Sequence, residues 1–342
     1  MGPDQSTVED NFDAEVARTD DATGTSIGRR SYLRLTAGVA TALGTGATTS
    51  VSASDNAIGR IANEKQTGSV PSDGDATWAI DYDDYSSTDQ VHEWDSDSAD
   101  FVSSPSMRGN TSLEWRHRQE TNHGNSIVRL GDFEDRLPEL TSTGHAYECY
   151  YTTYIYMPST MPTAGDGEYT MRFGFAGLSS GEAVSGSGSP PLDGTNGWYA
   201  APMWTSHSGV NPSPDSLGYG LNFYDLNYGS SSNFYSDYEI TPDDDWHKYD
   251  FYMNVNSWEG TSKDANGVVK LWHDDNLVLH EDDLVLTHSE DNMIEYIGSQ
   301  WNLLRYNGSA TSDFEWYWDA MDIYLGEDIP SDVRDGVERP WW

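Results

Sequence analysis

The stretch WHKYDFYMNVN, from Trp246 to Asn256, decides the fold. Its odd-numbered residues fall on one side of a period-two pattern and are mostly apolar: His247, Tyr249, Phe251, Met253 and Val255. The even-numbered residues are mostly polar: Lys248, Asp250, Tyr252, Asn254 and Asn256. Because successive side chains of a strand point to opposite faces of a sheet, this pattern predicts a half-buried strand with one face for the core and one for water.

The alternation continues outward from this strand in both directions. Downstream, Val268 to Trp272 and Leu277 to Leu279 are predicted strands joined by the tight acidic turn Asp274-Asp275-Asn276. Further strands are predicted within residues 112–119, 146–157, 169–178, 197–205, 218–228, 294–306 and 314–325. Residues 78–101 predict an edge strand with loops, and the Gly-, Ser- and Pro-rich residues 179–197 predict a long mobile loop.

The sequence shows no convincing helical period, no Gly-rich phosphate loop and no repeat of helical or propeller type. Roughly 250 residues of closely spaced antiparallel strands therefore predict a single all-β domain. We expect a concanavalin-like β-jelly roll, an antiparallel β-sandwich, over residues 76–330. Residues 331–342 are predicted to be a peripheral tail.

The charge is strongly one-sided. The chain holds 57 acidic and 18 basic side chains, for a formal net charge of −39, while aromatic residues make up 13%. The aromatic content predicts a folded core, and the charge indicates a salt-adapted protein of the haloarchaeal type, because concentrated salt screens such repulsion. Nucleic acid is not expected as a partner, and anionic membranes are poor partners, since both would be repelled. The single cysteine, Cys149, excludes an internal disulfide and is predicted to lie in the core.

The first 53 residues are predicted to be an export signal. Arg29-Arg30 is followed by Tyr32 and Leu33, then by a weakly apolar run and the small-residue pattern Val51-Ser52-Ala53. This order resembles a twin-arginine signal, which predicts the Tat translocase as a partner during export and a secreted, extracellular location. The apolar run is too short and too rich in Gly and Thr for a membrane span. Residues 54–75 predict a disordered linker.

Residues 112–326 resemble the jelly-roll domain of family 14 polysaccharide lyases, of the alginate and glucuronan lyase type. One matching block contains Trp246, Asp250, Tyr252 and Asn256. A second contains Asn266-Gly267-Val268, Trp272, Asp274 and Leu277-Val278, and the last strand carries Trp318-Asp319. The resemblance implies a groove with a Lys, a Ser-x-Arg pair and a Tyr-x-Tyr pair. In this chain those positions hold Arg172, then Tyr199 and Ala201, then Asn222 and Tyr224.

The resemblance implies β-elimination on a uronate-containing, anionic polysaccharide. This reaction needs a group that neutralises the carboxylate, a base and an acid, but no cofactor. The predicted catalytic set is Arg172, Asn222, Tyr224 and His117. Aromatic and polar residues are predicted to bind the sugar rings: Tyr150, Tyr154, Trp198, Trp204, Lys248 and Tyr252. Asp319 is a candidate ligand for a structural Ca²⁺ ion.

Each candidate also has a structural interpretation. Arg172 could be a surface charge that flanks a strand, His117 a hydrogen-bonded strand residue, and several of the aromatic residues part of the core. Asp319 could simply face solvent. The alternative function is a non-catalytic carbohydrate-binding or cell-surface protein on the same scaffold. The changes at Tyr199 and Ala201 favour that alternative, whereas Arg172, Asn222 and Tyr224 on one groove favour the enzyme.

Overall fold

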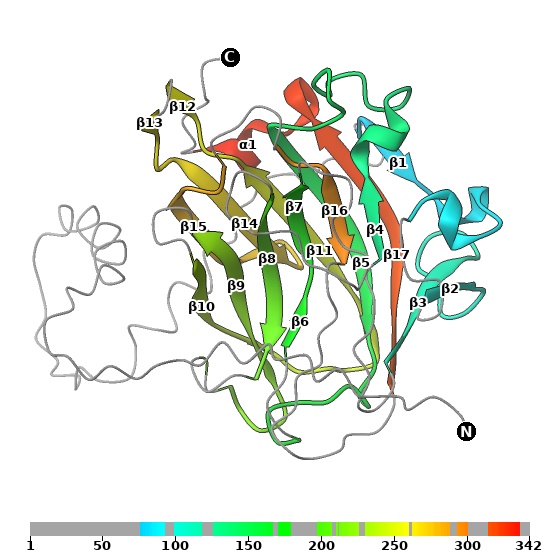
Figure 1. The fold of residues 1–342 in the computed structure, drawn as a ribbon. Coiled ribbons are helices and arrows are strands. Elements are labelled where there is room, and N and C mark those ends of the chain that lie inside the picture. Colours follow the sequence, from blue (N-terminus) through cyan, green and yellow to red (C-terminus); the bar gives the residue numbers. More distant parts are fainter. Residues whose placement is uncertain are drawn as a thin grey trace, which may run out of the picture. The chain divides into compact units, whose positions relative to one another are not determined.

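The computed structural model describes residues 76–92, 99–117, 126–166, 170–178, 197–206, 210, 212–225, 230–259, 262–287, 293–299 and 314–335. Antiparallel strands form two sheets that pack as two layers (Figure 1). The predicted all-β jelly roll is thus confirmed. The predicted export signal and linker, residues 1–75, lie outside the described residues, as does nearly all of the predicted loop 179–197.

Sheet A holds the predicted strand Trp246–Asn256 near its middle. Its order is β15 (Asn276–Leu284), β14 (Gly267–His273), β11 (Asp245–Asn254), β5 (Glu148–Met157), β17 (Phe314–Leu325), β3 (Ser112–His117) and β2 (Ala99–Val102). The short strand β1 (Trp78–Ile80) also pairs with β17. The predicted hairpin through Asp274 and Asp275 is confirmed, and both residues take the positive φ angles (46° and 64°) that a tight hairpin turn requires.

Sheet B runs in the order β10 (Ser230–Ile240), β9 (Leu217–Asp225), β8 (Gly197–Thr205), β7 (Gly174–Leu178), β16 (Tyr296–Ser299) and β4 (Ser126–Arg129). Strand β6 (Thr170–Arg172) also pairs with β8, and β12 (Trp258–Glu259) with β13 (Ser262–Lys263). The described helical segments are short: η3 (Tyr82–Asp84), η4 (Thr88–Gln90), η5 (Leu130–Phe133), η6 (Gly326–Asp328) and α1 (Ser331–Arg334). None of these is long and apolar enough to cross a membrane.

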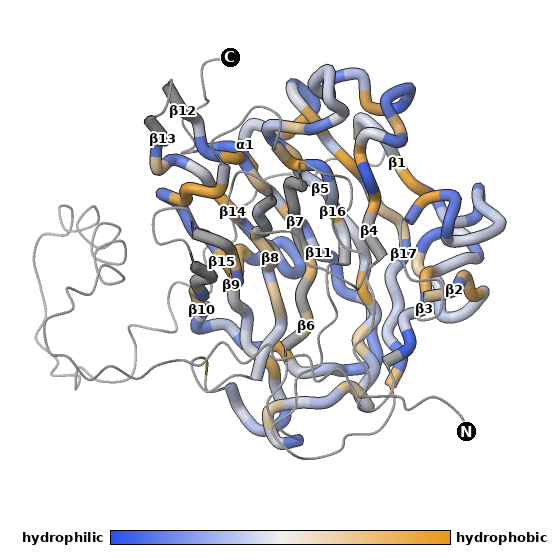
Figure 2. Tube along the Cα trace, viewed as in Figure 1, coloured by the Kyte–Doolittle hydropathy of each residue, from blue (hydrophilic) through white to orange (hydrophobic). Residues whose placement is uncertain are grey.

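The core lies between the sheets and is rich in aromatic rings. Trp204 of sheet B meets Trp316 and Tyr249 of sheet A edge to face, with ring centroids 5.6 and 5.5 Å apart. Such pairs contribute about 0.5–1.5 kcal/mol each beyond the burial of their surface. Hydrophobic segments, orange in Figure 2, fall mainly on strands. Cys149 is fully buried here, as predicted.

The outer face of sheet A differs from the prediction for β11. The odd-numbered residues Tyr249, Phe251 and Met253 are buried in the core, as predicted. The even-numbered face was expected to meet water, which is wrong for Asp250 and Tyr252, because their exposed fractions are 2% and 0%. Strand alternation gives the two faces of a strand correctly, but it does not reveal that another segment covers the second face.

Part of that cover comes from the C-terminal residues, which were expected to be peripheral. Within the described residues 331–335, the Arg334 guanidinium forms an ion pair with Glu148 of β5. The Lys270 ammonium of β14 donates to the carbonyl of Val333 at 2.8 Å. The expectation of a peripheral tail is therefore wrong for these residues, which tie the chain end to sheet A.

Candidate functional site

Strand register brings three of the predicted catalytic positions to one face of sheet B. On β9, Tyr219, Leu221 and Phe223 belong to the core, so Asn222 and Tyr224 occupy the alternate, outward positions. Arg172 of β6 pairs with Met203 of β8, and Met203 pairs with Gly220 of β9. Because paired residues share a face, Arg172 falls on the same side as Asn222 and Tyr224.

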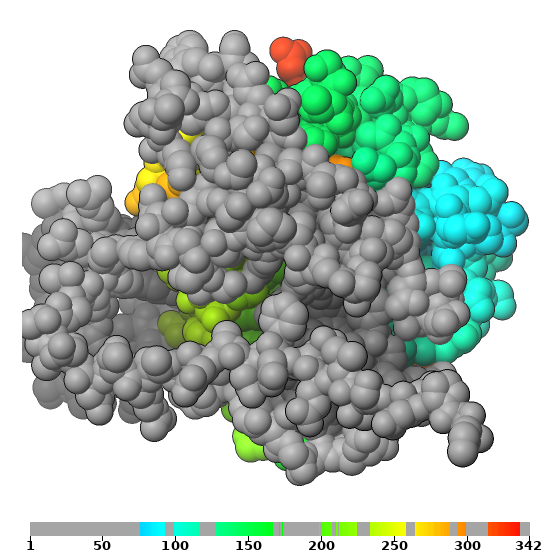
Figure 3. Space-filling view, viewed as in Figure 1, coloured from blue at the N-terminus to red at the C-terminus, as the bar shows by residue number. Residues whose placement is uncertain are grey.

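We call these positions, together with Ala201 and Met203, the outer face of sheet B. Gly220 shapes it, because a Cβ atom there would lie 2.8 Å from Met203 Cε. Glycine thus gives the methionine room to lie over β9. In Figure 3, atoms of the β9–β10 part of the chain (yellow-green) are visible near the centre of the view. The side chains of Arg172 and Tyr224 themselves lie outside the described residues.

Asn222 has a described side chain on this face. Its Nδ2 donates to Oδ1 of Asn233, which pairs with it across β9 and β10, at 2.6 Å. Only 3% of Asn222 is exposed. The bond to Asn233 fixes the orientation of the amide, which is the property a carboxylate-binding group needs.

His117 does not join this set. It ends β3 of sheet A and pairs with Phe314 of β17. In the alternation of the strand, its position falls on the same side as that of the core residue Trp115. The two sheets are different layers of the sandwich, so the prediction that His117 converges with Arg172 is not met by the fold. The error has a simple physical cause, because a period-two pattern does not say to which sheet a strand belongs.

Trp198 and Trp204 were predicted to stack on sugar rings, and the structure corrects this. Both side chains are fully buried in the core between the sheets. Trp204 contacts Phe173 and Tyr249 there, with ring centroids 5.0 and 5.5 Å away. A ring in this position stabilises the sandwich and is closed to a polymer.

The other predicted sugar-binding residues lie on the outer face of sheet A. Tyr150 donates to Asp250 at 2.9 Å, and Lys248 Nζ lies 3.1 Å from the same carboxylate. Burial raises the pKa of Asp250 to about 6, against the opposing effect of Lys248. Tyr252 is fully buried and donates to Glu148 at 2.8 Å. Tyr150 and Tyr252 are therefore closed to a sugar ring, which corrects their prediction.

Tyr154 and Lys248 lie on the same sheet and are partly exposed. Tyr154 is half-buried and pairs with Lys248 across β5 and β11. Both occupy sheet A, whereas Arg172, Asn222 and Tyr224 occupy sheet B. The predicted catalytic and binding residues therefore do not line one common groove.

Asp319, the candidate Ca²⁺ ligand, orders a loop through hydrogen bonds. Its Oδ2 accepts hydrogen bonds from the backbone amides of Met107 and Arg108, the latter at 2.8 Å. The Arg108 guanidinium then forms two bonds to Asp322, at 2.9 and 2.7 Å. Asp319 is 1% exposed, so the expectation of a solvent-facing carboxylate is wrong, while its role as a Ca²⁺ ligand stays a prediction. Burial raises its pKa to about 6.

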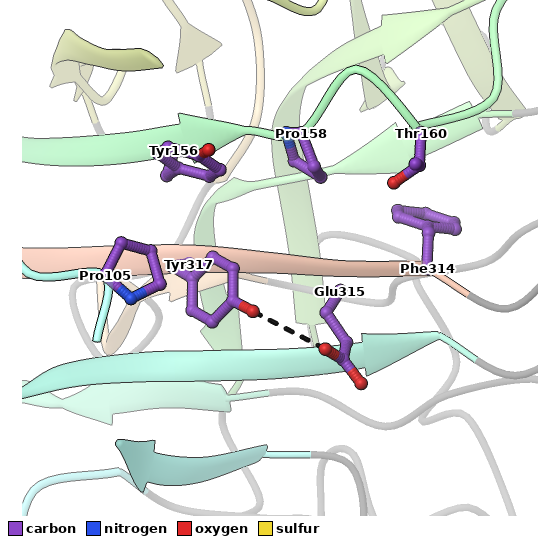
Figure 4. A pocket seen from close by; sticks show the side chains of 7 residues that line it. All are labelled: Pro105, Tyr156, Pro158, Thr160, Phe314, Glu315 and Tyr317. Carbon is purple, nitrogen blue, oxygen red and sulfur yellow. Dashed lines mark hydrogen bonds between the residues drawn. The ribbon is translucent and has the colours of Figure 1, made fainter. Parts of the chain in front are cut away.

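A pocket of about 450 Å³ opens on the outer face of sheet A. Its lining is shown in Figure 4: Pro105, Tyr156, Pro158, Thr160, Phe314, Glu315 and Tyr317. Tyr156 meets Tyr317 and Trp246 edge to face, with centroids 5.7 and 5.6 Å apart, so three rings form a row across β17, β5 and β11. Partial burial, with Glu114 and Glu315 nearby, raises the pKa of Tyr317 to about 12, so its phenol stays protonated.

A second polar cluster lies where the β10–β11 and β14–β15 turns meet. His247 Nδ1 is 2.7 Å from Asp274 Oδ2, and His247 Nε2 is 2.9 Å from Asp243 Oδ1. Hydrogen bonds to these carboxylates, chiefly the one to Asp274, raise the pKa of His247 to about 9. Partial burial acts in the opposite direction and lowers it. His273 completes the cluster, with its ring centroid 4.7 Å from that of His247.

No family model and no curated protein matches this chain. Several solved structures align with parts of this chain. The alginate lyase Aly36B aligns at a TM-score of 0.46 and 13% identity, over 72% of this chain and 95% of that one. The marine PL-14 alginate lyase from Aplysia kurodai gives 0.48 and 11%, over 73% and 99%. The endo-β-1,4-glucuronan lyase from the fungus Trichoderma reesei gives 0.44 and 12%, over 73% and 96%. These likenesses concern the fold alone.

Sequence reasoning missed the pocket row and the histidine cluster. Tyr317 and Trp246 do stand at outward positions of a period-two pattern, which is a usable signal. Their contact with Tyr156 depends on β5 lying between β11 and β17, and no local sequence pattern predicts that strand order. His247 and His273 come together because β11 pairs with β14. In that register His273 lies opposite Tyr249, two residues after His247.

Proposed function

We propose that this protein is a polysaccharide lyase-like enzyme that cleaves a uronate-containing polysaccharide by β-elimination on the outer face of sheet B. The observation that carries the proposal is the register that sets Arg172, Asn222 and Tyr224 on one face of neighbouring strands. The resemblance of the sequence blocks to family 14 lyases supports the same activity.

The three residue types match the needs of the reaction. Arg172 would neutralise the uronate carboxylate, and the amide of Asn222 would donate a hydrogen bond to it, which acidifies the adjacent C–H bond. Tyr224, as phenolate, would take that proton. The electron pair then forms the carbon–carbon double bond as the glycosidic bond breaks, and the leaving oxygen takes a proton back from Tyr224. A cation such as Arg172 on the same face would favour the phenolate form.

The test is a screen of alginate, glucuronan and related polymers in high salt, followed by the ultraviolet absorbance of the unsaturated uronide product. The proposal predicts that at least one polymer gives a rising absorbance. Neutral polymers such as cellulose serve as controls, because they have no carboxylate to acidify the C–H bond and should give none. If no uronate polymer is cleaved, the lyase proposal fails.

A second candidate, non-catalytic binding of a glycan, is favoured by the pocket on sheet A. The row of Trp246, Tyr156 and Tyr317 offers aromatic surface beside the carboxylate of Glu315, a combination suited to sugar rings and their hydroxyls. Glycan binding that is unchanged by Tyr224→Ala but lost in the double variant Tyr156→Ala/Tyr317→Ala would support this function. The reverse pattern would support the enzyme.

We also propose that the protein is exported by the twin-arginine route and works in concentrated salt. The supports are the Arg29-Arg30 pair with its weakly apolar run, and the net charge of −39. Replacement of both arginines by lysine should retain the protein inside the cell. Export that continues unchanged in that variant would contradict the proposed route.

A further inference from the structure

Two histidines and one aspartate gather at one end of sheet A, apart from the positions of the proposed elimination. They are His247 on β11, His273 at the end of β14, and Asp274 in the turn that follows. Each offers one ligand atom, and these atoms lie within 4.8 Å of one another. In the part of the chain that the structure describes, no other group of three His, Cys, Asp or Glu side chains meets this spacing.

We propose that this cluster binds a divalent transition-metal ion of the Zn²⁺ type. Imidazole nitrogens and a carboxylate oxygen are a common three-ligand set for such ions, and a fourth position is filled by water or another ligand. His247 Nδ1 and His273 Nε2 lie 2.7 and 3.2 Å from Asp274 Oδ2. Ligand bonds of about 2.0–2.2 Å need separations slightly above 3 Å, so shifts on the order of 1 Å suffice.

The surroundings hold each ligand in place. Nε2 of His247 is hydrogen bonded to Asp243, the carboxylate–histidine arrangement that orients a metal-binding imidazole. Oδ1 of Asp274 accepts the backbone N–H of Lys248 at 2.9 Å, which leaves Oδ2 for the ion. The His273 ring stacks on Tyr249, with centroids 4.9 Å apart and planes at 12°.

His273 supplies a further indication. Its Nε2 is buried and, despite lying 3.2 Å from Asp274 Oδ2, forms no hydrogen bond of acceptable geometry. A buried nitrogen without such a bond is costly, and an ion coordinated by it would remove that cost. The side chains of His247 and His273 are 14% and 16% exposed and that of Asp274 is 46% exposed, so an ion can enter from solvent.

The alternative is a charged hydrogen-bond cluster, with His247 as an imidazolium between Asp243 and Asp274. Both arrangements use the same distances, but only one depends on His273 Nε2 as a ligand. His273→Gln and Asp274→Asn keep the size of each side chain while they remove a ligand. His280→Gln is the matched control, because His280 is exposed on the neighbouring strand β15 and lies outside the cluster.

The experiment is calorimetric titration of the chelator-stripped full chain with ZnCl₂. Excess Mg²⁺ and high salt are present to occupy the many surface carboxylates. The proposal predicts one Zn²⁺ per chain in the parent and in His280→Gln. It also predicts affinities lowered by about 100-fold or more in His273→Gln and Asp274→Asn, and by about 10–100-fold in Asp243→Asn. Circular dichroism checks that each variant is folded.

Substitution with Co²⁺ provides a second readout, since its visible absorption depends on coordination geometry. The proposal predicts a ligand-field spectrum in the parent that is absent in His273→Gln. The inference is overturned if the parent binds Zn²⁺ no more tightly than His273→Gln, or if His280→Gln lowers the affinity as much as His273→Gln does.

Discussion

Arg334, in the helix α1, donates two hydrogen bonds of 2.7 Å each to Glu148 of β5, from Nε to Oε1 and from Nη2 to Oε2. The two residues are separated by 186 positions in the sequence. Glu148 also accepts the hydroxyl of Tyr252 at 2.8 Å. The chain end, the middle strand of sheet A and its neighbour β11 are thereby joined through one carboxylate.

Arg334→Ala should destabilise the protein. The side chain of Arg334 is 9% exposed and that of Glu148 is 15% exposed, and removal of one partner from such a pair leaves a poorly solvated charge. The expected loss is about 3 kcal/mol in the free energy of unfolding, measured by chemical denaturation. Arg136→Ala is the matched control, because Arg136 is 64% exposed. It should change stability by less than about 0.5 kcal/mol. Equal effects of the two substitutions would show that the pair with Glu148 contributes little.

His92→Phe should make the protein less sensitive to acid. Burial lowers the pKa of His92 to about 3, whereas an unfolded histidine titrates near its usual 6.5. Between these values the unfolded chain binds the extra proton, so the His92 contribution to stability is present above pH 6.5 and is lost as pH falls. The loss in the parent relative to the variant is about 2 kcal/mol between pH 7.5 and pH 5. Denaturation curves at both pH values measure it, and parallel losses in the two proteins would contradict it.

Stability should rise with salt. A net charge of −39 repels itself, and the Debye length falls from about 10 Å at 0.1 M to about 3 Å at 1 M ionic strength. The melting temperature is therefore expected to increase steadily over this range in NaCl or KCl. A melting temperature that stays constant or falls would mean that the charge is already compensated in the folded protein.

The aromatic row of the sheet A pocket should contribute to packing. Tyr156 contacts both Tyr317 and Trp246, so Tyr156→Ala removes two ring contacts, while Tyr156→Phe keeps them. The expected loss for Tyr156→Ala is about 1–3 kcal/mol in the free energy of unfolding, with a much smaller change for Tyr156→Phe. Thermal denaturation compares the two, and similar losses would assign the effect to the hydroxyl instead of the ring.

The strands were largely predictable because their residues alternate. Phe314–Leu325 was predicted with the bounds of β17, and the turn at Asp274 was recognised from its residue types. Strand β10 was missed, because the Ser-rich start of Ser230–Ile240 resembles a loop. Among the described strands it pairs with β9 alone and forms the edge of sheet B, where fewer apolar residues are needed.

The candidate site was less predictable, because faces and layers depend on distant segments. Trp204 and Tyr252 both follow period-two patterns, yet nothing local shows that Trp204 faces the core or that Tyr252 meets Glu148. Arg172, Asn222 and Tyr224 share a face because β6 and β9 both pair with β8. His117 belongs to the other sheet for the same kind of reason, since β3 pairs with β17.

The most direct test of the central claim compares Tyr224→Phe with Tyr154→Phe in the absorbance assay on a cleaved uronate polymer. Both changes remove one phenolic hydroxyl, but Tyr224 holds a position on the outer face of sheet B and Tyr154 lies on sheet A. We predict a fall in kcat of about 10²–10⁴-fold for Tyr224→Phe and a rate near that of the parent for Tyr154→Phe. Equal rates in the two variants, or a loss confined to Tyr154→Phe, would contradict the placement of the reaction on sheet B.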